Sequence, residues 1–134
     1  TQNFNAVPTL QEALRLAREF QEDPEVAQRE WAITHYLMEA LTGDPRIHLY
    51  GVPRGTQVKV PLFSFTVEGA HHEDLALILD KMGIAVRSGQ MCAEPLMDRF
   101  GVTGMLRISF APYNTMEEAE YFVKCLNKAI NMLI

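Results

Sequence analysis

Short strand-like segments alternate with capped helices along most of this chain, and this order limits the possible folds more than any other feature. Residues 60–67 alternate apolar and polar side chains, as expected of a strand with one buried face. Further strand candidates lie at residues 47–50, 84–86 and 105–110. Helices are expected between and after these segments, so the predicted fold class is α+β, with a short sheet covered on one side by helices. The order of such short, interrupted strands within a sheet cannot be read from the sequence.

Helix boundaries are marked by capping patterns. Thr9 with Glu12, and Thr115 with Glu118, have the spacing of a capping box and predict two helix starts. Asp23 precedes a proline and predicts a third start, for a helix that runs to a glycine at position 43. Two shorter helices, each followed by a glycine suited to a left-handed cap, are expected at residues 72–82 and 95–100.

Composition limits the class of protein. The 134 residues, 48% of them hydrophobic, suffice for one ordinary domain, and we expect residues 1–134 to form it. The net charge of −5 and the absence of a basic run argue against a nucleic-acid partner. No apolar stretch is long enough to cross a membrane. With only two cysteines, the chain fits a reducing, cytoplasmic compartment better than a disulfide-stapled secreted one.

The segment from Arg87 to Pro95 carries the most chemistry. It joins a strand candidate to a short helix and holds Cys92 among small residues, so the thiol is expected to be at least partly exposed. Arg87 and the start of the following helix offer positive charge to a thiolate, whereas Glu94 opposes them. From these local features alone, a small buried cysteine without a role is an equally good interpretation.

A longer match resolves this ambiguity. Residues 83–89, Gly-Ile-Ala-Val-Arg-Ser-Gly, followed by Cys-Ala-x-Pro-Leu-Met at residues 92–97, resemble the active-site cysteine segment of the Suf-type (group II) cysteine desulfurases and selenocysteine lyases, in the class-V aminotransferase family. Residues 106–115, Leu-Arg-Ile-Ser-Phe-Ala-Pro-Tyr-Asn-Thr, resemble the family's next segment. The resemblance covers essentially the whole chain. It implies the small, C-terminal domain of a fold-type I enzyme dependent on pyridoxal 5′-phosphate (PLP).

The resemblance also implies roles for single residues. Cys92 stands at the position of the nucleophile that takes sulfur from cofactor-bound L-cysteine as a persulfide, which leaves L-alanine and supplies iron–sulfur cluster assembly. Arg107 matches the arginine that grips the substrate carboxylate, and a guanidinium offers a planar two-pronged partner for this group. Arg87 lies in the matched stretch and is a candidate for lining the substrate pocket. Thr1 matches a threonine near the cofactor phosphate of the neighbouring subunit in a homodimer.

The chain departs from the family in two respects. Many members carry histidine directly before the cysteine, whereas this chain has Gln90 and Met91, so a proton-shuttle role for those histidines does not carry over. The family's Schiff-base lysine follows a histidine in the large domain. None of the four lysines here has that context: Lys59, Lys81, Lys124 and Lys128. We therefore expect the large PLP-lysine domain to be absent from this chain, which alone is predicted to be inactive and to bind no PLP covalently.

Alternatives follow from the same residues. Selenocysteine lyase, or a related PLP lyase, shares this half of the site. For this chain taken alone, the missing lysine favours a stand-alone sulfur-carrier or binding module without PLP chemistry, whereas the start on a residue other than methionine and the Thr1 match favour an enzyme domain of a longer protein. A SufE- or SufU-like protein is the expected sulfur acceptor, and no metal site is expected. His71 and His72 are interpreted as capping or packing residues rather than catalytic ones, and Cys125 as a packing thiol on the last helix.

Overall fold

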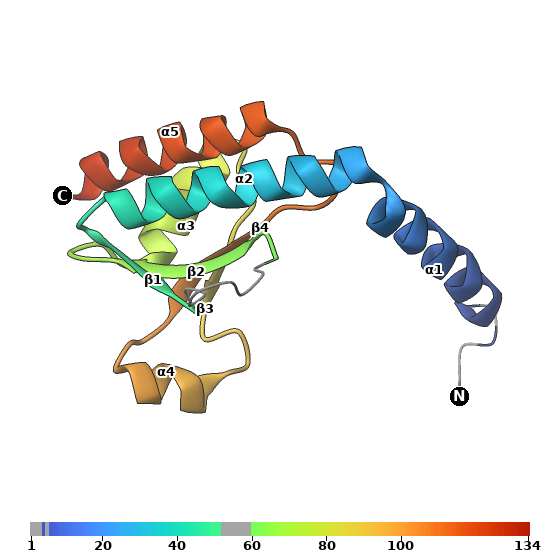
Figure 1. Cartoon of the computed structure of the whole chain (residues 1–134). Coiled ribbons are helices and arrows are strands. Elements are labelled where there is room, and N and C mark those ends of the chain that lie inside the picture. The colour runs from blue at the N-terminus through green and yellow to red at the C-terminus, as the bar shows by residue number, and fades with distance from the viewer. Residues whose placement is uncertain (1–3, 5, 52–59) are drawn as a thin grey trace.

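The computed structural model describes residues 4, 6–51 and 60–134. Within them the chain forms helices and strands of an α+β fold, as the sequence predicts (Figure 1). In chain order the elements are α1 (Ala6–Glu22), α2 (Pro24–Gly43), β1 (Ile47–Tyr50), β2 (Leu62–Val67), α3 (His72–Lys81), β3 (Arg87–Gly89), α4 (Glu94–Phe100), β4 (Met105–Ser109) and α5 (Met116–Leu133).

The strands form one antiparallel sheet in the order β1-β2-β4-β3. Side chains alternate between its two faces, and in β2 every second residue is buried. The buried set includes Phe63 and Phe65, which face the helices, and their partners across β4 are Ile108 and Leu106. This is the inner face of the sheet.

Helices α2, α3 and α5 cover the inner face, in the layer above the strands in Figure 1. Their apolar stripes supply most of the core. The largest side chains with almost no exposure are Phe63, Phe65, Ile33, Leu37, Leu41, Leu75, Leu79, Leu106, Leu126 and Ile130. Cys125, with 6% of its surface exposed, belongs to the same cluster.

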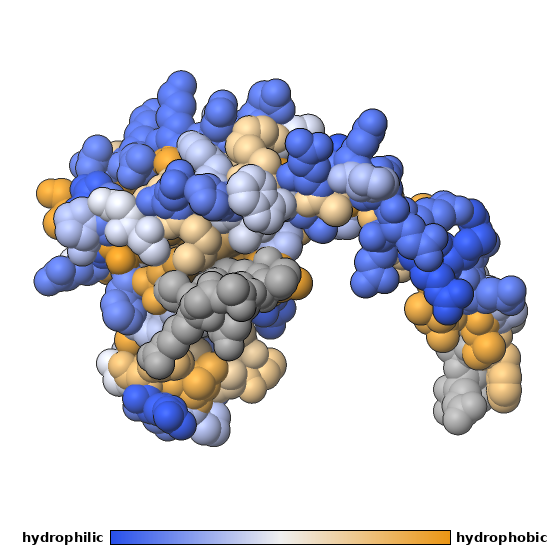
Figure 2. All heavy atoms as spheres, viewed as in Figure 1, coloured by the Kyte–Doolittle hydropathy of each residue, from blue (hydrophilic) through white to orange (hydrophobic). Residues whose placement is uncertain are grey.

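Among the described residues, the short helix α4 is the one helix on the opposite, outer face of the sheet, below the strands in Figure 1. Helix α1 extends away from the sheet and has no buried residue. Figure 2 shows apolar side chains at the far end of α1 and around α4. The stability of the domain therefore comes from the inner face, and the outer face is free to carry chemistry.

Most of the predicted capping patterns are confirmed. Asp23 Oδ1 accepts from Glu25 N at 2.8 Å, with a proline at the first helical position. Thr115 and Glu118 form the reciprocal capping box of α5. Gly101, with φ of 68°, ends α4 in the left-handed conformation.

The capping box predicted at Thr9 is wrong. Helix α1 begins three residues earlier, at Ala6, and the Thr9 hydroxyl donates back to the Ala6 carbonyl at 2.7 Å. Pro8 does not stop the helix, because first-turn N–H groups have no intrahelical acceptor and proline lacks only that donor.

The strand expected at residues 84–86 is also wrong, because pairing with β4 begins at Arg87. The end of α3 holds this segment, with Gly83 N and Ile84 N donating to Asp80 O and Leu79 O. These bonds tie Ile84 to the end of the helix, and the ladder starts three residues later than the apolar pattern indicates.

Candidate functional site

The loop after β3 holds its cysteine in an unusual backbone conformation. Met91 and Cys92 both have positive φ, 57° and 60°, in the left-handed region that residues other than glycine rarely adopt. Ala93 N donates to Gln90 O at 3.0 Å and closes the turn. Strained conformations of this kind are concentrated at functional sites, where the surrounding structure holds them in place.

The two cysteines differ in exposure, as the sequence predicts. Cys92 is free and exposed, whereas Cys125 is free and buried in the core under α5. A thiol on a strained, exposed loop is accessible to a substrate. A thiol buried under a helix is not.

One row of paired residues crosses all four strands on the outer face. Tyr50 of β1 lies opposite Ser64 of β2, which lies opposite Arg107 of β4, and this residue lies opposite Arg87 of β3. The register therefore places the two predicted arginines directly across from each other. Like charges in this arrangement repel each other unless an anion lies between them.

The Arg107 side chain is half-buried, and its Nε atom is fully buried. This atom has no hydrogen-bond partner among the described residues. A buried guanidinium donor without an acceptor is costly, and a carboxylate is the acceptor that best fits its geometry. The arrangement therefore favours an anionic ligand at Arg107.

A cavity of about 420 Å³ lies between the outer face and the cysteine loop with α4. Arg107 and Ser64 contribute from the sheet, and Met91 and Ala93, the two neighbours of Cys92, contribute from the loop. The full lining is Tyr50, Gly51, Leu62, Ser64, Gln90, Met91, Ala93, Leu96, Met97, Phe100, Met105 and Arg107. Cys92 and Arg87 are not among these residues, so the cavity joins Arg107 to the cysteine loop but not to the thiol itself.

Two aromatic residues hold α4 against the sheet, and the sequence did not predict their contact. The Tyr50 and Phe100 rings lie 4.8 Å apart between centroids, and the Tyr50 hydroxyl lies 3.4 Å from Thr66 Oγ1. The contact joins β1 to α4, which are far apart in the sequence, so no local pattern predicts it. Since α4 follows the cysteine loop directly, this contact also helps to place the loop.

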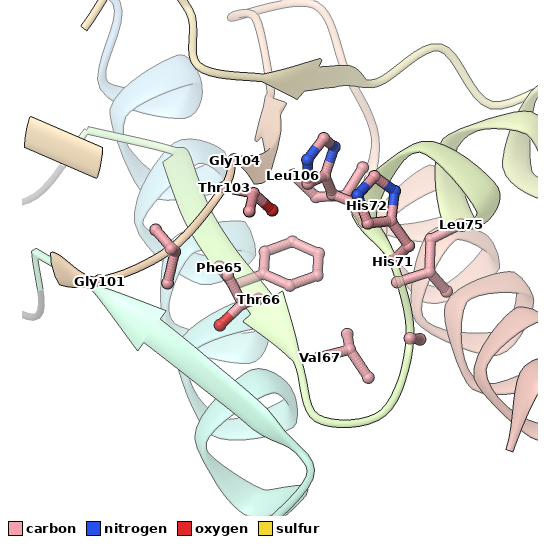
Figure 3. A pocket seen from close by; sticks show the side chains of 12 residues that line it. Phe65, Thr66, Val67, His71, His72, Leu75, Gly101, Thr103, Gly104 and Leu106 are labelled. Carbon is pink, nitrogen blue, oxygen red and sulfur yellow. The ribbon is translucent and has the colours of Figure 1, made fainter. Parts of the chain in front are cut away.

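The paired histidines make structural contacts, as expected. His71 is the N-cap of α3, and its Nδ1 accepts from Glu73 N at 3.3 Å. His72 is buried beside a smaller cavity of about 260 Å³ between β2, the segment 101–104 and the start of α3 (Figure 3). Burial lowers the pKa of His72, and the neighbouring His71 lowers it further.

Thr1, the remaining predicted site residue, lies outside the described residues. Among the residues that the structure describes, no group of three or more metal-ligating side chains is found. None of the helices in the described ranges is long and apolar enough to span a membrane.

Comparison with known proteins assigns the class. Residues 1–122 match the class-V aminotransferase family, and the chain belongs to that family.

Its relatives within the family include cysteine desulfurases. A probable cysteine desulfurase of Vibrio cholerae is 49% identical over 79 residues, covering 59% of this chain and 20% of the relative. One from Xylella fastidiosa strain Temecula1 is 41% identical over 109 residues, covering 81% of this chain and 26% of the relative.

Solved structures agree with this assignment. The crystal structure of the Escherichia coli cysteine desulfurase CsdA, in an S-sulfonic acid form, matches with a TM-score of 0.70 and 33% identity over 81% of this chain. The apo cysteine desulfurase of Thermococcus onnurineus matches with a TM-score of 0.70 and 36% identity over 79% of this chain. In both cases the match covers 26% of the solved chain. The chain thus spans about a quarter of the length of the relatives it matches.

Proposed function

We propose that this chain is the sulfur-accepting, C-terminal part of a PLP-dependent cysteine desulfurase of the Suf type. Cys92 takes the sulfur of L-cysteine, and Arg107 holds the substrate carboxylate. The observation that carries the proposal is the 420 Å³ cavity, which is lined by Arg107 on one side and by both neighbours of Cys92 on the other.

The described lysines do not fit a covalent cofactor at this cavity. Lys81 ends α3, and Lys124 and Lys128 are exposed on α5, so all three belong to the helix layer on the inner side of the sheet. Lys59 lies outside the described residues. The chain's side chains thus fit the substrate half of a PLP site, and the Schiff-base lysine is proposed to come from a large domain of a longer protein.

Helix α1 supports the proposal of a longer protein. Its apolar residues Val7, Leu10 and Leu14 are each more than half exposed, although they share one face of the helix. A helix with such a face and no buried residue normally packs against another element. The large domain is the proposed partner of this face, and Thr1 is proposed to lie near the cofactor phosphate of the second subunit in a homodimer.

The chemistry assigned to this chain begins with substrate positioning. Arg107 donates from its guanidinium to the carboxylate of L-cysteine and fixes the amino acid with its sulfur near the cysteine loop. Arg87, paired across the strands with Arg107, adds positive charge to the same region. When bound, PLP withdraws electrons from the amino acid and makes its sulfur open to attack by a thiolate.

Sulfur transfer then occurs at Cys92. Its thiolate attacks the substrate sulfur, so that an S–S bond forms while the substrate C–S bond breaks. The substrate carbon keeps the electron pair and gains a proton, giving L-alanine, and Cys92 holds the persulfide. Gln90 and Met91 carry no titratable group, so they cannot supply or remove a proton in this step.

Release of the sulfur is proposed to need a partner. The loop that carries Cys92 is short, because β3 ends at Gly89 and α4 begins at Glu94. Both ends of the loop are tied to regular elements, so the thiol cannot travel far from the sheet. A SufE- or SufU-like protein is proposed to present its own thiol at Cys92 and to pass the sulfur to iron–sulfur cluster assembly in the cytoplasm.

The test uses the full-length enzyme that contains this domain. Alanine release from L-cysteine is measured for the wild type, Cys92→Ser and Arg107→Ala, with and without the acceptor. Loss of turnover in Cys92→Ser, a raised KM in Arg107→Ala, and a severalfold stimulation of the wild type by the acceptor support the proposal. Full turnover by Cys92→Ser would contradict it and indicate a lyase that does not need this thiol. The matched control is Cys125→Ser, which is expected to retain wild-type turnover.

The 134-residue chain is proposed to be inactive by itself. It is incubated with PLP, dialysed, and examined for a cofactor absorbance band and for sulfide release from L-cysteine. A retained band together with sulfide release would contradict the assignment of the Schiff-base lysine to a separate domain.

A further inference from the structure

His72 occupies an unusual place for a histidine. It is the first residue of α3, yet only 9% of its surface is exposed, and it is the only polar residue among the buried ones that the structure describes. Its ring packs on Gly104, which precedes β4. A Cβ atom at Gly104 would collide with His72 Nε2, so only glycine fits there beside this ring.

Gly104 also contacts the residue from which the cysteine loop starts. A Cβ at Gly104 would also lie 2.9 Å from the Cα of Gly89, so the two glycine backbones are in close contact. Gly89 is the last residue of β3, has φ of 100°, and pairs with Met105 of β4. The loop to Cys92 starts at this glycine. The contacts thus run from the imidazole through Gly104 to the base of the cysteine loop.

We propose that His72 is a positioning residue for the Cys92 loop: its buried imidazole fills the space beside Gly104 and, through Gly104, fixes Gly89 and the path of the loop. The importance of this positioning for sulfur transfer rests on the proposed function, whereas the contacts of His72, Gly104 and Gly89 are observed independently of it. Within the cavity of Figure 3, the ring closes the side formed by the start of α3.

The surroundings of the ring make its placement sensitive to protonation. The Nδ1 atom is buried and has no hydrogen-bond partner among the described residues. Burial lowers the pKa of His72, and the charge of His71 adds to this, while Glu73 and Asp74 act in the opposite direction. The other polar side chains lining the cavity are two threonines, from β2 and the segment 101–104, and neither titrates.

The sign of the pH effect follows from this lowered pKa. Above the ordinary value of 6.5, the imidazole is neutral in both the folded and the unfolded chain, and the full stability is present. As the pH falls below 6.5, the unfolded chain takes up the proton first, so folding stability decreases. Because Nδ1 has no partner among the described residues, protonation in the folded state would require water or a new acceptor at the ring, and we expect it to displace the ring from Gly104.

The experiment compares two substitutions at one position in the 134-residue chain. His72→Ala removes the ring, whereas His72→Phe keeps a ring of similar shape that cannot titrate. Amide hydrogen exchange at Ala93, whose N–H closes the loop turn, reports local opening of the cysteine loop. The alkylation rate of Cys92 under native conditions is measured in parallel.

At neutral pH, His72→Ala is expected to speed exchange at Ala93 by at least about fivefold and to change the alkylation rate of Cys92. His72→Phe is expected to keep wild-type exchange at Ala93. On acidification below pH 6.5, the protection of Ala93 relative to intrinsic exchange should fall in the wild type and stay constant in His72→Phe. The matched control is Val26→Ala, a buried substitution at the start of α2, which should leave the Cys92 loop unchanged.

Three results would overturn the proposal: unchanged Ala93 protection in His72→Ala, an equal loss in Val26→Ala, or an acid response that persists in His72→Phe. These outcomes are independent of sulfur chemistry. If Cys92→Ser retains full turnover while the loop responds to His72 as described, the proposed function fails and the positioning role stands. If turnover depends on Cys92 but His72→Ala leaves amide exchange at Ala93 unchanged, only the positioning role fails.

Discussion

Replacing Arg107 by methionine should make the isolated domain more stable, although the same change should weaken substrate binding in the proposed full-length enzyme. Most substitutions in a half-buried strand destabilise a protein, so the sign of this effect is diagnostic. The reason is the environment of the side chain: Arg107 lies directly opposite Arg87, and its buried Nε has no hydrogen-bond partner among the described residues.

The magnitude follows from two contributions. A like-charged pair directly opposite across two strands costs up to about 1 kcal/mol, and salt screens this cost. A buried donor without an acceptor costs about 1–3 kcal/mol, of which the lower end applies because Arg107 is only half-buried. Methionine keeps the aliphatic contacts with the cavity wall, so that little packing is lost. The net expectation is a gain of about 1 kcal/mol in the free energy of unfolding.

The assay is urea unfolding of the 134-residue chain, followed by circular dichroism at low and high salt. The wild type should gain stability with salt relative to Arg107→Met, because only the wild type holds the facing charges. Arg87→Met serves as the control that relieves the repulsion but leaves the buried donor. A loss of about 1 kcal/mol or more in Arg107→Met at both salt concentrations would refute the reasoning, because the arginine would then be a stabilising residue.

Three further predictions concern the rest of the domain. Iodoacetamide under native conditions should label Cys92 much faster than Cys125, as shown by mass mapping of the modified peptides; faster labelling of Cys125 would contradict the observed difference in exposure. Thr115→Ala, which breaks the capping box with Glu118, should lower the free energy of unfolding by about 1 kcal/mol in a urea titration, and an unchanged midpoint would show that the cap contributes nothing. Leu37→Ala, in the fully buried stripe of α2, should cost about 3 kcal/mol by the same assay, and a cost below that of Thr115→Ala would contradict its place in the core.

Local rules predicted the elements of this fold but not their arrangement. The caps at Asp23 and Thr115 were predictable because each depends on residues two or three positions apart. The strand order β1-β2-β4-β3 was not predictable, because β4 lies between β2 and β3 through pairing of residues that are distant in the sequence. The error at Thr9 has the same origin, since a threonine inside a first helical turn and a threonine at an N-cap have similar sequence surroundings.

The candidate site was likewise predictable only in part. Resemblance to a family selected Cys92 and Arg107, and the sequence pattern predicted a strand at residues 105–110. The register between β3 and β4, which sets Arg87 opposite Arg107, required the structure. So did the Tyr50–Phe100 contact, which joins the first strand to the helix after the cysteine loop.

The inner face of the sheet is packed without local conflicts, whereas the outer side carries several. This difference is the strongest physical argument for placing the candidate site on the outer side. On the inner face, alternating apolar residues meet apolar helix stripes, so local pattern and packing agree. On the outer side, two arginines face each other, a guanidinium donor is buried without a described partner, and two consecutive residues other than glycine adopt positive φ. Each of these features costs stability. Sequences usually retain such local conflicts where function requires them, and here all three border one cavity or the loop beside it. Under the proposed function, an anionic substrate at Arg107 would offset the first two costs, and a thiol held beside that substrate would account for the third.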